Sequence, residues 1–308
     1  MPVASQAQWH WKNVDSLYQP LPVGMHVYIT QDSIEGKPNI AYYVSAELKE
    51  KSLAFTTETG KGKRLTPTQY FEQEGKPLLV MNCTFFEFVH NSNLNIVVKE
   101  GKMEAFQVHN SNGRGKDTFT YHHSYGSAIG ITKKRKADIA WLYTDSSARY
   151  PYASEEVINA FTDSTIQHTR KEMLAKGVFK KWKMQSAVGG GPVLIQNGEI
   201  KITNNEELKF AGKAISDKHP RTAMGYTKNG QLILMVIQGR FPNIAEGATL
   251  VQEAQMLKEI GCEEALNLDG GGSSCLLVNG KQTIIPSDKE GQRPVPAVFL
   301  IKSRVKSE

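Results

Sequence analysis

Cysteine is scarce in this sequence. Its 308 residues include three, Cys83, Cys262 and Cys275, and none belongs to a CxxC pair. A disulfide framework needs an even set of cysteines, and a Cys-rich zinc site needs closely spaced thiols. The sequence excludes both and leaves room for one disulfide bond at most.

Long apolar runs are absent as well. The longest clean run is residues 232–237, whereas a membrane-spanning helix needs about 18 or more apolar residues. The first four residues, MPVA, lack the charged and apolar regions of a signal peptide. A start codon placed on an already processed secreted chain would look the same, so this end does not fix the localisation.

Neither sign of charge is concentrated in one region. Residues 1–154 hold 17 basic and 14 acidic side chains and residues 155–308 hold 20 and 17, so each half carries +3 of the net +6. A small positive excess favours an anionic substrate, but a nucleic-acid surface needs the charge gathered into a stripe. We therefore expect no nucleic-acid partner.

The usual nucleotide-binding patterns and internal repeats are also missing. No Gly-Lys pair is followed by Ser or Thr, and no spaced glycines match a dinucleotide fingerprint. The histidines at 90, 109, 122 and 123 show no metal-like spacing with acids, and His122 and His123 would point to opposite faces of a strand. The sequence thus gives no sign of a nucleotide site or a histidine-based metal site.

The sequence does contain many short strand-like segments. We expect strands at residues 25–30, 40–44, 53–57, 78–81, 95–98, 127–132, 139–143, 187–188, 193–195, 222–226, 232–238, 265–268, 275–278 and 298–301. Asn-Gly pairs at 197–198, 229–230 and 279–280 are typical of tight hairpin turns. The pattern predicts an α+β fold with a mixed, largely antiparallel sheet and a few packed helices.

Three regional predictions follow from the same pattern. Residues 1–75 should form a strand-rich extension packed on a main domain of residues 76–308. Ser154, followed by two glutamates, resembles a helix N-terminus and predicts helix over much of 154–176. The polar stretch 108–124 is expected to be a long loop.

Two glycine triplets are the most distinctive local feature. Gly189-Gly190-Gly191 and Gly270-Gly271-Gly272 each follow a strand-like segment, and the second is flanked by Asp269 and Ser273. Glycine lets backbone amides converge on a phosphate or oxyanion without a Cβ in the way. The alternative is a pair of tight turns, with Asp269 capping the backbone that follows it.

A helix before the second triplet places an acid on its apolar side. Thr249 and Gln252 form a capping-box pattern, and Gly261 ends the helix. Glu253 falls inside the apolar arc, so its carboxylate should meet a cationic or donor group or have a raised pKa. It is either a structural ion-pair partner or a catalytic or site-ordering acid.

Two arginines and an asparagine complete the candidate site. Arg221, followed by Thr222, precedes one strand and Arg240 follows the next, and arginine suits carboxylate or phosphate recognition. We expect the two arginines at opposite ends of neighbouring strands, so that only one shares the glycine site. Asn82 ends an apolar strand, which favours a semi-buried site residue over a glycan acceptor.

Taken together, these motifs resemble the phosphodiester glycosidase family, the domain of the enzyme that uncovers mannose 6-phosphate. The motifs, in chain order, are Asn82-Cys83-Thr84-Phe85-Phe86, Gly189-Gly190-Gly191-Pro192, His219-Pro220-Arg221-Thr222-Ala223-Met224-Gly225, the Glu253 helix, Asn267-Leu268-Asp269-Gly270-Gly271-Gly272-Ser273-Ser274 and Arg293-Pro294-Val295-Pro296. The likeness runs from about Asn82 to the C-terminus.

The resemblance implies a hydrolase that cleaves a sugar-1-phosphodiester of the N-acetylglucosamine type, releasing sugar and a phosphomonoester. It implies Asp269 and Glu253 as the catalytic pair. The residues expected to bind substrate or phosphate are Asn82, Gly190, Gly191, Arg221, Thr222, Gly270, Gly271, Gly272 and Ser273. It also implies a phosphorylated glycan as partner, no cofactor, and export from the cell.

Two alternatives remain open at this stage. The same pocket could serve a non-catalytic glycan or cell-wall binding module. Asp269 and Glu253 could instead hold a divalent cation that assists hydrolysis.

Overall fold

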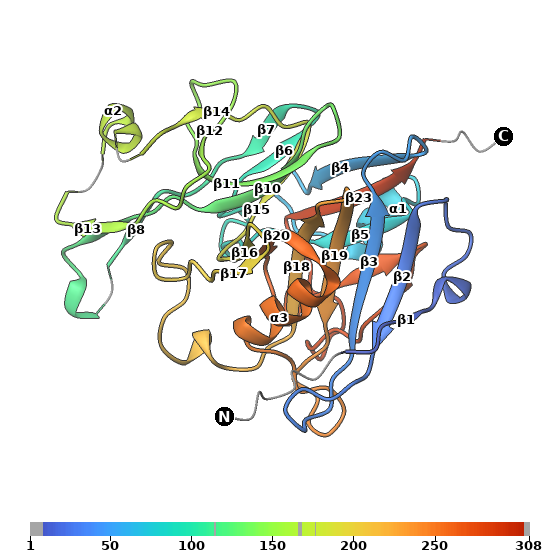
Figure 1. Cartoon of the computed structure of the whole chain (residues 1–308). Helices are drawn as coiled ribbons and strands as arrows, with labels where there is room; N and C mark the ends of the chain where they lie inside the picture. Colours follow the sequence, from blue (N-terminus) through green and yellow to red (C-terminus); the bar gives the residue numbers. More distant parts are fainter. Residues whose placement is uncertain (1–8, 114, 166–167, 176, 305–308) are drawn as a thin grey trace.

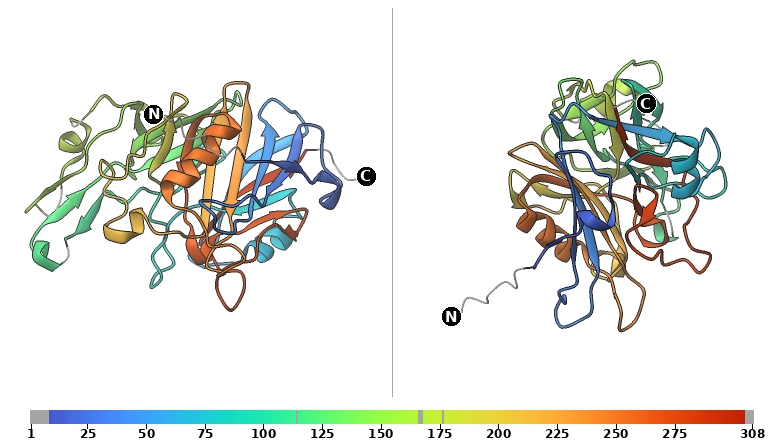
Figure 2. Two further views of the ribbon diagram at one scale, coloured as in Figure 1. Left: turned by 60° about the horizontal axis from the view of Figure 1, so that its bottom comes forward. Right: turned by 90° about the vertical axis from the view of Figure 1, so that its right-hand side faces the viewer.

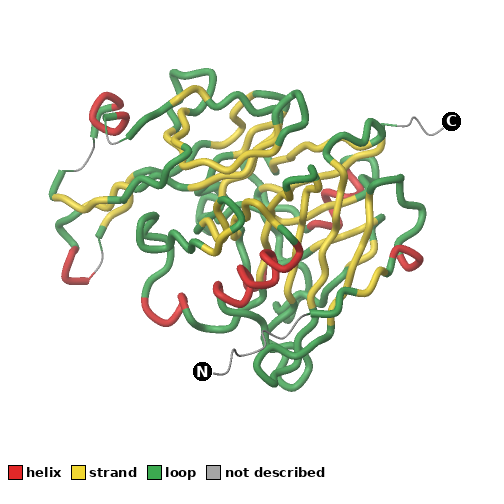
Figure 3. The backbone as a smooth tube through the Cα atoms, viewed as in Figure 1, coloured by secondary structure: helices red, strands yellow, loops and turns green. Residues whose placement is uncertain are grey.

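The computed structural model describes residues 9–113, 115–165, 168–175 and 177–304. Most of this chain is strand or loop (Figure 3), arranged in four sheets whose strands pair antiparallel (Figure 1). The fold is mainly β. The predicted antiparallel pairing is therefore confirmed, but the expected balance of helix and strand is not.

The sheets differ in size. The eight-stranded sheet has the order β1 (Lys12–Asn13), β2 (Met25–Thr30), β3 (Ala41–Glu47), β19 (Gln231–Ile237), β18 (Arg221–Thr227), β20 (Cys262–Asn267), β16 (Val193–Gln196) and β17 (Glu199–Ile200). The seven-stranded sheet has the order β14 (Lys180–Lys181), β12 (Tyr152–Ser154), β11 (Ala137–Tyr143), β10 (Ser127–Ile131), β15 (Ser186–Gly189), β6 (Val97–Lys99) and β7 (Lys102–Ala105). The five-stranded sheet has the order β22 (Lys281–Gln282), β21 (Leu276–Val278), β5 (Leu79–Asn82), β23 (Ala297–Ser303) and β4 (Leu53–Thr59). The three-stranded sheet consists of β13 (Phe161–Asp163), β9 (Tyr121–His123) and β8 (Asn110–Asn112).

The helices are few and short. They are α1 (Pro67–Gln73), α2 (Arg170–Leu174) and α3 (Leu250–Ile260), with 3-10 turns at Asp15–Leu17, Gly115–Asp117, Gly212–Ile215 and Gly271–Ser273. No helix within the described ranges is long and apolar enough to span a bilayer.

Side chains on the two faces of β19 belong to two separate hydrophobic cores. Ile233 and Met235 belong to the apolar cluster that α3 covers (Figure 1), whereas Leu234 and Val236 face the cluster shared with the five- and seven-stranded sheets. Successive strand side chains point to opposite faces, so the eight-stranded sheet is buried on both sides. This explains why 232–237 is a continuous apolar run.

The prediction for α3 is confirmed. Thr249 and Gln252 form a complete capping box, and Gly261 adopts the left-handed conformation at φ +93°. The Asn-Gly hairpins are also found, linking β16 to β17, β18 to β19 and β21 to β22.

The long helix predicted over 154–176 was wrong. Ser154 ends β12, and its hydroxyl both donates to the Glu156 carbonyl and accepts from the Glu156 amide, which closes a turn. Helix is found only in α2, where Thr169 supplies the cap; residues 166–167 and 176 lie outside the described ranges. The prediction of one long loop over 108–124 was also wrong, because this stretch contains β8 and β9, in a sheet far from β2 and β3 (Figures 1 and 2).

The first strands belong to sheets shared with the C-terminal half. β3 pairs with β19 along its whole length, and β4 pairs with β23. Residues 25–59 thus contribute to both large cores. The domain boundary at residue 75 stays a prediction.

Candidate active site

Both glycine triplets lie where the chain crosses between sheets. Gly190 and Gly191 join β15 of the seven-stranded sheet to β16 of the eight-stranded sheet, and residues 268–275 join β20 to β21 of the five-stranded sheet. The segment after β5 crosses from the five-stranded sheet to β6 of the seven-stranded sheet. The Asp269 amide donates to the Cys83 carbonyl at 2.9 Å, which ties two of these crossings together. Three sheets therefore meet at one junction.

A cavity of about 200 Å³ opens at this junction. The predicted site residues in its wall are Arg221, Asp269, Gly270, Gly271 and Gly272. The remaining wall consists of Phe85, Phe210, Ala214, His219, Pro220, Arg240, Leu268 and Arg293. Among these described wall residues the cavity combines a carboxylate with three guanidinium groups and two phenyl rings.

The three arginines approach from different elements. Arg221 begins β18, Arg240 follows β19 and Arg293 precedes β23. In the β18–β19 hairpin Arg221 lies opposite Ile237, so Arg240 lies at the same end of the pair. The prediction that Arg221 and Arg240 lie at opposite ends was wrong, because antiparallel pairing brings the start of one strand beside the end of the other.

The arginines differ in how their charge is compensated. The Arg221 side chain donates from Nε to the Ala248 carbonyl at 2.8 Å and from a terminal nitrogen to the Asp217 carbonyl at 3.2 Å. Burial lowers its pKa, with Glu253 acting in the opposite sense. Arg293, by contrast, forms a bidentate pair with Asp288 at 2.7 and 2.9 Å. Arg221 is held by neutral carbonyls, so its positive charge remains available to an anion.

The environment of the Asp269 carboxyl group favours its protonated, neutral form. Burial raises its pKa to about 6, against the lowering effects of the Ser273 hydroxyl, Arg293, Lys209 and the Gly270 amide. A carboxyl group with a pKa near the working pH is suited to proton transfer. Asp269 is therefore the candidate acid–base group of this cavity.

Asn82 and Thr222 lie behind the cavity wall and are fully buried. The Asn82 amide nitrogen donates to the Asp269 carbonyl at 2.6 Å, and its oxygen accepts from the Thr222 hydroxyl at 3.1 Å and from the Cys275 amide at 3.0 Å. The Thr222 hydroxyl also lies 3.1 Å from that of Ser274. These contacts fix the backbone of the Asp269 loop and leave substrate contact by Asn82 and Thr222 a prediction.

Glu253 faces inward, as its place on α3 predicts, but it does not line the cavity. Its side chain is 0% exposed, and among the described residues neither carboxyl oxygen has a hydrogen-bond partner. Burial raises its pKa to about 8, although the charge of Arg221 acts to lower it. The charge of Arg221 thus acts on Glu253, but among the described residues the two make no hydrogen bond or ion pair, and Glu253 does not line the cavity that contains Asp269.

The first glycine triplet does not offer its amides to a ligand. The Gly190 amide donates to the Ser127 carbonyl at 3.0 Å, and the Gly191 amide donates to the Asn267 carbonyl at 2.8 Å. A Cβ on Gly190 would lie 2.4 Å from the Asn267 carbonyl oxygen. These glycines allow two sheets to approach closely, so the expectation that Gly190 and Gly191 bind phosphate through their amides is corrected.

The second triplet lies in the cavity wall. The Gly271 amide donates to the Pro220 carbonyl at 2.8 Å, and the Ser273 hydroxyl lies 3.5 Å from a terminal nitrogen of Arg293. A Cβ on Gly272 would lie 2.1 Å from an Asp288 carboxyl oxygen and 2.2 Å from Arg293. Gly272 thus makes room for the Arg293–Asp288 pair.

Lys209 is a further cation that the sequence analysis missed. Its ammonium group donates to the Gly190 carbonyl at 2.8 Å and lies 3.7 Å from the centre of the Phe85 ring. Burial lowers its pKa to about 8, opposed by Glu207 and Asp269. The preceding sequence, Asn204-Asn205-Glu206-Glu207, is typical of a solvated turn and gave no signal for a buried lysine.

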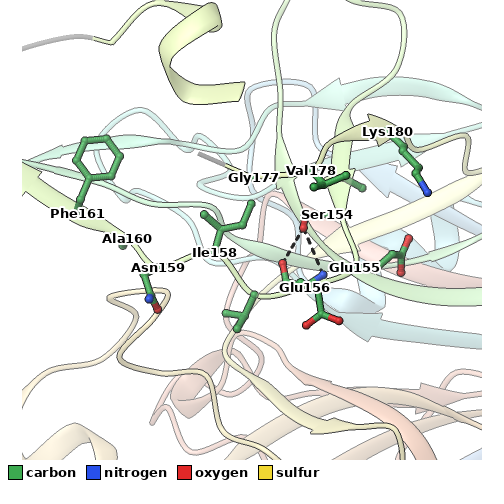
Figure 4. Close-up of a pocket in the computed structure, with 12 residues that line it drawn as sticks. Ser154, Glu155, Glu156, Ile158, Asn159, Ala160, Phe161, Gly177, Val178 and Lys180 are labelled. Carbon is green, nitrogen blue, oxygen red and sulfur yellow. Dashed lines mark hydrogen bonds between the residues drawn. The ribbon is translucent and has the colours of Figure 1, made fainter. Parts of the chain in front are cut away.

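A larger cavity of about 730 Å³ lies elsewhere, beside β12 and β13. Figure 4 shows Glu155, Glu156, Ile158, Phe161 and Lys180 among its wall residues. It contains none of the predicted site residues. The cavity at the sheet junction is therefore the better candidate active site despite its smaller volume.

Comparisons with known proteins agree with the motifs at the junction. The phosphodiester glycosidase family model matches residues 77–302. The chain belongs to the phosphodiester glycosidase family.

Curated relatives match part of this chain. The mouse N-acetylglucosamine-1-phosphodiester alpha-N-acetylglucosaminidase is 33% identical over 103 residues, and the human enzyme of the same name is 35% identical over 103 residues. Each match covers 31% of this chain and 20% of the relative. The matched region thus spans about a fifth of these relatives' length.

Solved structures share the fold over nearly the whole chain. The catalytic domain of the zebrafish enzyme of that name, auto-inhibited by its pro-peptide, has a TM-score of 0.62 at 20% identity and covers 97% of this chain and 89% of that one. A hypothetical protein from Synechocystis has a TM-score of 0.60 at 16% identity, with 97% and 69% covered. At these identities the likeness concerns the fold alone.

Proposed function

We propose that this chain hydrolyses the glycosidic bond of a sugar-1-phosphodiester, releasing free sugar and a phosphomonoester. The observation that carries the proposal is the gathering of Arg221, Arg240 and Arg293 around Asp269 in one cavity. A phosphodiester supplies the anion that three guanidinium groups select. An N-acetylglucosamine-type sugar is part of the proposal because the curated relatives are named for it.

In the proposed reaction Asp269, in its ionised form, accepts a proton from water. The water oxygen forms a bond to the anomeric carbon, and the bond from that carbon to the phosphate oxygen breaks. The electron pair leaves on the phosphate oxygen, where the guanidinium groups stabilise the added negative charge. A phosphomonoester is a weakly basic leaving group, so the reaction does not depend on a second carboxyl group as acid.

The other predicted residues act through these groups. Glu253 acts on Arg221 through its charge alone, whereas Asn82 and Thr222 position the Asp269 loop through hydrogen bonds. Phe85 and Phe210, with ring centres 5.9 Å apart in the cavity wall, offer apolar surface to a sugar face. The Gly271 amide is already paired with the Pro220 carbonyl, so it takes no part in phosphate binding in this proposal.

The test is release of N-acetylglucosamine from a panel of sugar-1-phosphodiesters by the full chain. Asp269→Asn and Arg221→Ala should each lower kcat/KM by about 100-fold or more, the scale of losing one transition-state contact. Asp117→Asn changes an exposed aspartate outside the cavity and should behave as the wild type. Unchanged turnover in both site variants would remove these residues from the mechanism.

The same assay separates the alternatives. A wild-type chain that binds these phosphodiesters without turning them over would be a glycan or cell-wall binding module. The cations around Asp269 favour hydrolysis without a divalent cation, so chelator treatment should leave turnover intact.

Export from the cell is part of the proposal. It is supported by the family, whose members are typically exported, and by likeness in fold to a Burkholderia pseudomallei protein proposed to be exported. That protein has a TM-score of 0.59 at 15% identity, with 86% of this chain and 74% of that one covered.

A further inference from the structure

A second cluster of reactive side chains lies in the three-stranded sheet, away from the sheet junction. His123 on β9, Asp163 at the end of β13 and His168 before α2 bring one potential metal-binding atom each to within 4.8 Å of the others. Nε2 of His123 lies 3.0 Å from one Asp163 carboxyl oxygen, and Nε2 of His168 lies 2.7 Å from the other. The two imidazole rings are nearly perpendicular, with centres 4.4 Å apart.

The two histidines turn their Nε2 atoms toward the same Asp163 carboxylate. Nδ1 of His123 lies 2.7 Å from the side-chain oxygen of Asn110, and Nδ1 of His168 lies 3.7 Å from a Glu172 carboxyl oxygen. The Asn110 oxygen is within hydrogen-bond distance of His123, whereas the contact of His168 with Glu172 is too long for a hydrogen bond. The two Nε2 atoms therefore converge on one carboxylate, an arrangement that a single cation between the three side chains would satisfy.

We propose that His123, Asp163 and His168 bind one divalent transition-metal ion of the zinc class. Two imidazole nitrogens and a carboxylate are donors that zinc accepts, at about 2.0–2.2 Å from the metal. Ligand atoms in a tetrahedral site with such bonds lie about 3.3 Å apart, so the three candidate atoms, which lie within 4.8 Å of one another, must close by up to about 1.5 Å. Asn110 then serves as the outer partner that fixes which nitrogen of His123 faces the metal, as is usual for metal-bound histidines. A water molecule would complete the fourth position.

The burial of this sheet gives the metal a structural role. All three β8 residues are exposed, none of β13 is buried, and His123 is the buried residue of β9. The His123 ring stacks on Phe161 with centres 4.8 Å apart. A three-stranded unit with so little apolar core is marginal without further support, and an ion held by these three side chains would link β9, β13 and the segment that leads into α2. This role is independent of the proposed hydrolase activity.

The test is a Zn²⁺ titration of the full chain after chelator treatment, measured by calorimetry. Metal analysis of the dialysed protein then gives the number of ions bound per chain. The wild type should bind about one ion per chain. His168→Gln should weaken binding by more than about 100-fold, since even an outer partner is worth about 10–100-fold. The matched control is His122→Gln, because the His122 side chain points away from the cluster toward Thr162, and it should keep full affinity.

Hydrogen exchange in the wild type tests the proposal without any substitution. In the wild type, Zn²⁺ should slow amide exchange in 121–123 and 161–163 and leave the strands of the junction unchanged. No binding by the wild type, equal binding by His168→Gln, or equal loss in His122→Gln would each overturn the proposal. Activity toward phosphodiesters is a separate measurement, so its failure would leave this result intact.

Discussion

At the scale of single residues, Asp269 determines how the proposed activity depends on pH. Its pKa is raised to about 6 by burial, and the proposed mechanism needs its ionised form. An acid is ionised above its pKa, so kcat/KM should fall about tenfold per pH unit below 6 and level off above it. The measurement is a pH–rate profile of sugar release with wild type.

The pH at which the acidic limb of this profile begins, where kcat/KM starts to fall, distinguishes Asp269 from an ordinary surface carboxylate. Arg293 and Ser273 lower the Asp269 pKa, so Arg293→Met should shift the limb to higher pH. A limb near pH 4 in the wild type would contradict the assignment of Asp269 as the base.

Glu253 makes a separate prediction about stability. Its pKa rises from 4.5 to about 8 on folding, so the folded chain binds this proton more tightly than the unfolded chain does. The resulting stabilisation is complete below pH 4.5 and is lost as the pH rises toward 8. Glu253→Gln stays neutral, and at pH 9 it should exceed the wild type in free energy of unfolding by on the order of 1 kcal/mol or more.

Urea unfolding at pH 5 and pH 9 measures this difference. Glu259→Gln on the same helix serves as the control, since Glu259 accepts a hydrogen bond at the exposed surface. Equal pH dependence in the wild type and Glu253→Gln would show that the buried carboxyl group is already ionised.

At the scale of elements, the loop from Asp269 to Ser274 holds the site through close approach of backbone and side chains. Gly272→Ala would place a methyl group 2.1 Å from the Asp288 carboxylate and 2.2 Å from Arg293. The ion pair must then move, and we expect KM for the phosphodiester to rise about tenfold with a loss of about 1–3 kcal/mol in stability.

Kinetics and thermal unfolding of this variant measure both effects. Gly75→Ala, after α1 and outside the cavity wall, is the matched control, because its Cβ would meet open space while its φ of +76° carries backbone strain. It should lose stability without a change in KM. Equal KM values for the two variants would contradict the role of Gly272.

Elements with strong local signals could be predicted from the sequence, and those that depend on distant partners could not. The Thr249 capping box fixed α3, and Asn-Gly pairs fixed three hairpins. The equivalent signal at Thr66 and Gln69, with Pro67 between them, begins α1 and was overlooked. The acids after Ser154 resembled a helix start, but the hydroxyl of Ser154 closes a turn instead.

The candidate site was predicted in part, for the same reason. Arg221, Asp269 and the second glycine triplet do share a cavity. Lys209 lies in a polar stretch whose burial depends on a contact with Gly190. His123 and His168 are 45 positions apart, so no spacing rule could pair them.

At the scale of the whole molecule, the sheet topology brings positive side chains from distant parts of the sequence into one cavity. Each half of the chain carries a net charge of only +3, yet the meeting of three sheets gathers Arg221, Arg240 and Arg293 in one cavity. A cavity with an excess of positive charge attracts anions over a distance that salt shortens. The overall composition therefore favours an anionic substrate only weakly, whereas the junction does so strongly.

The same sheets bury all three cysteines, which gives a prediction for the intact fold. Cys83, Cys262 and Cys275 are free thiols with at most 3% of their surface exposed. Burial raises the pKa of Cys83 and of Cys275 to about 12 and also raises that of Cys262. Thiolates are the reactive form, so a thiol reagent at pH 8 should modify none of them in the folded chain and all three in urea. A reducing agent should leave Tm unchanged, because the fold holds no disulfide among these residues; labelling of the folded chain, or a lower Tm on reduction, would contradict this closed core.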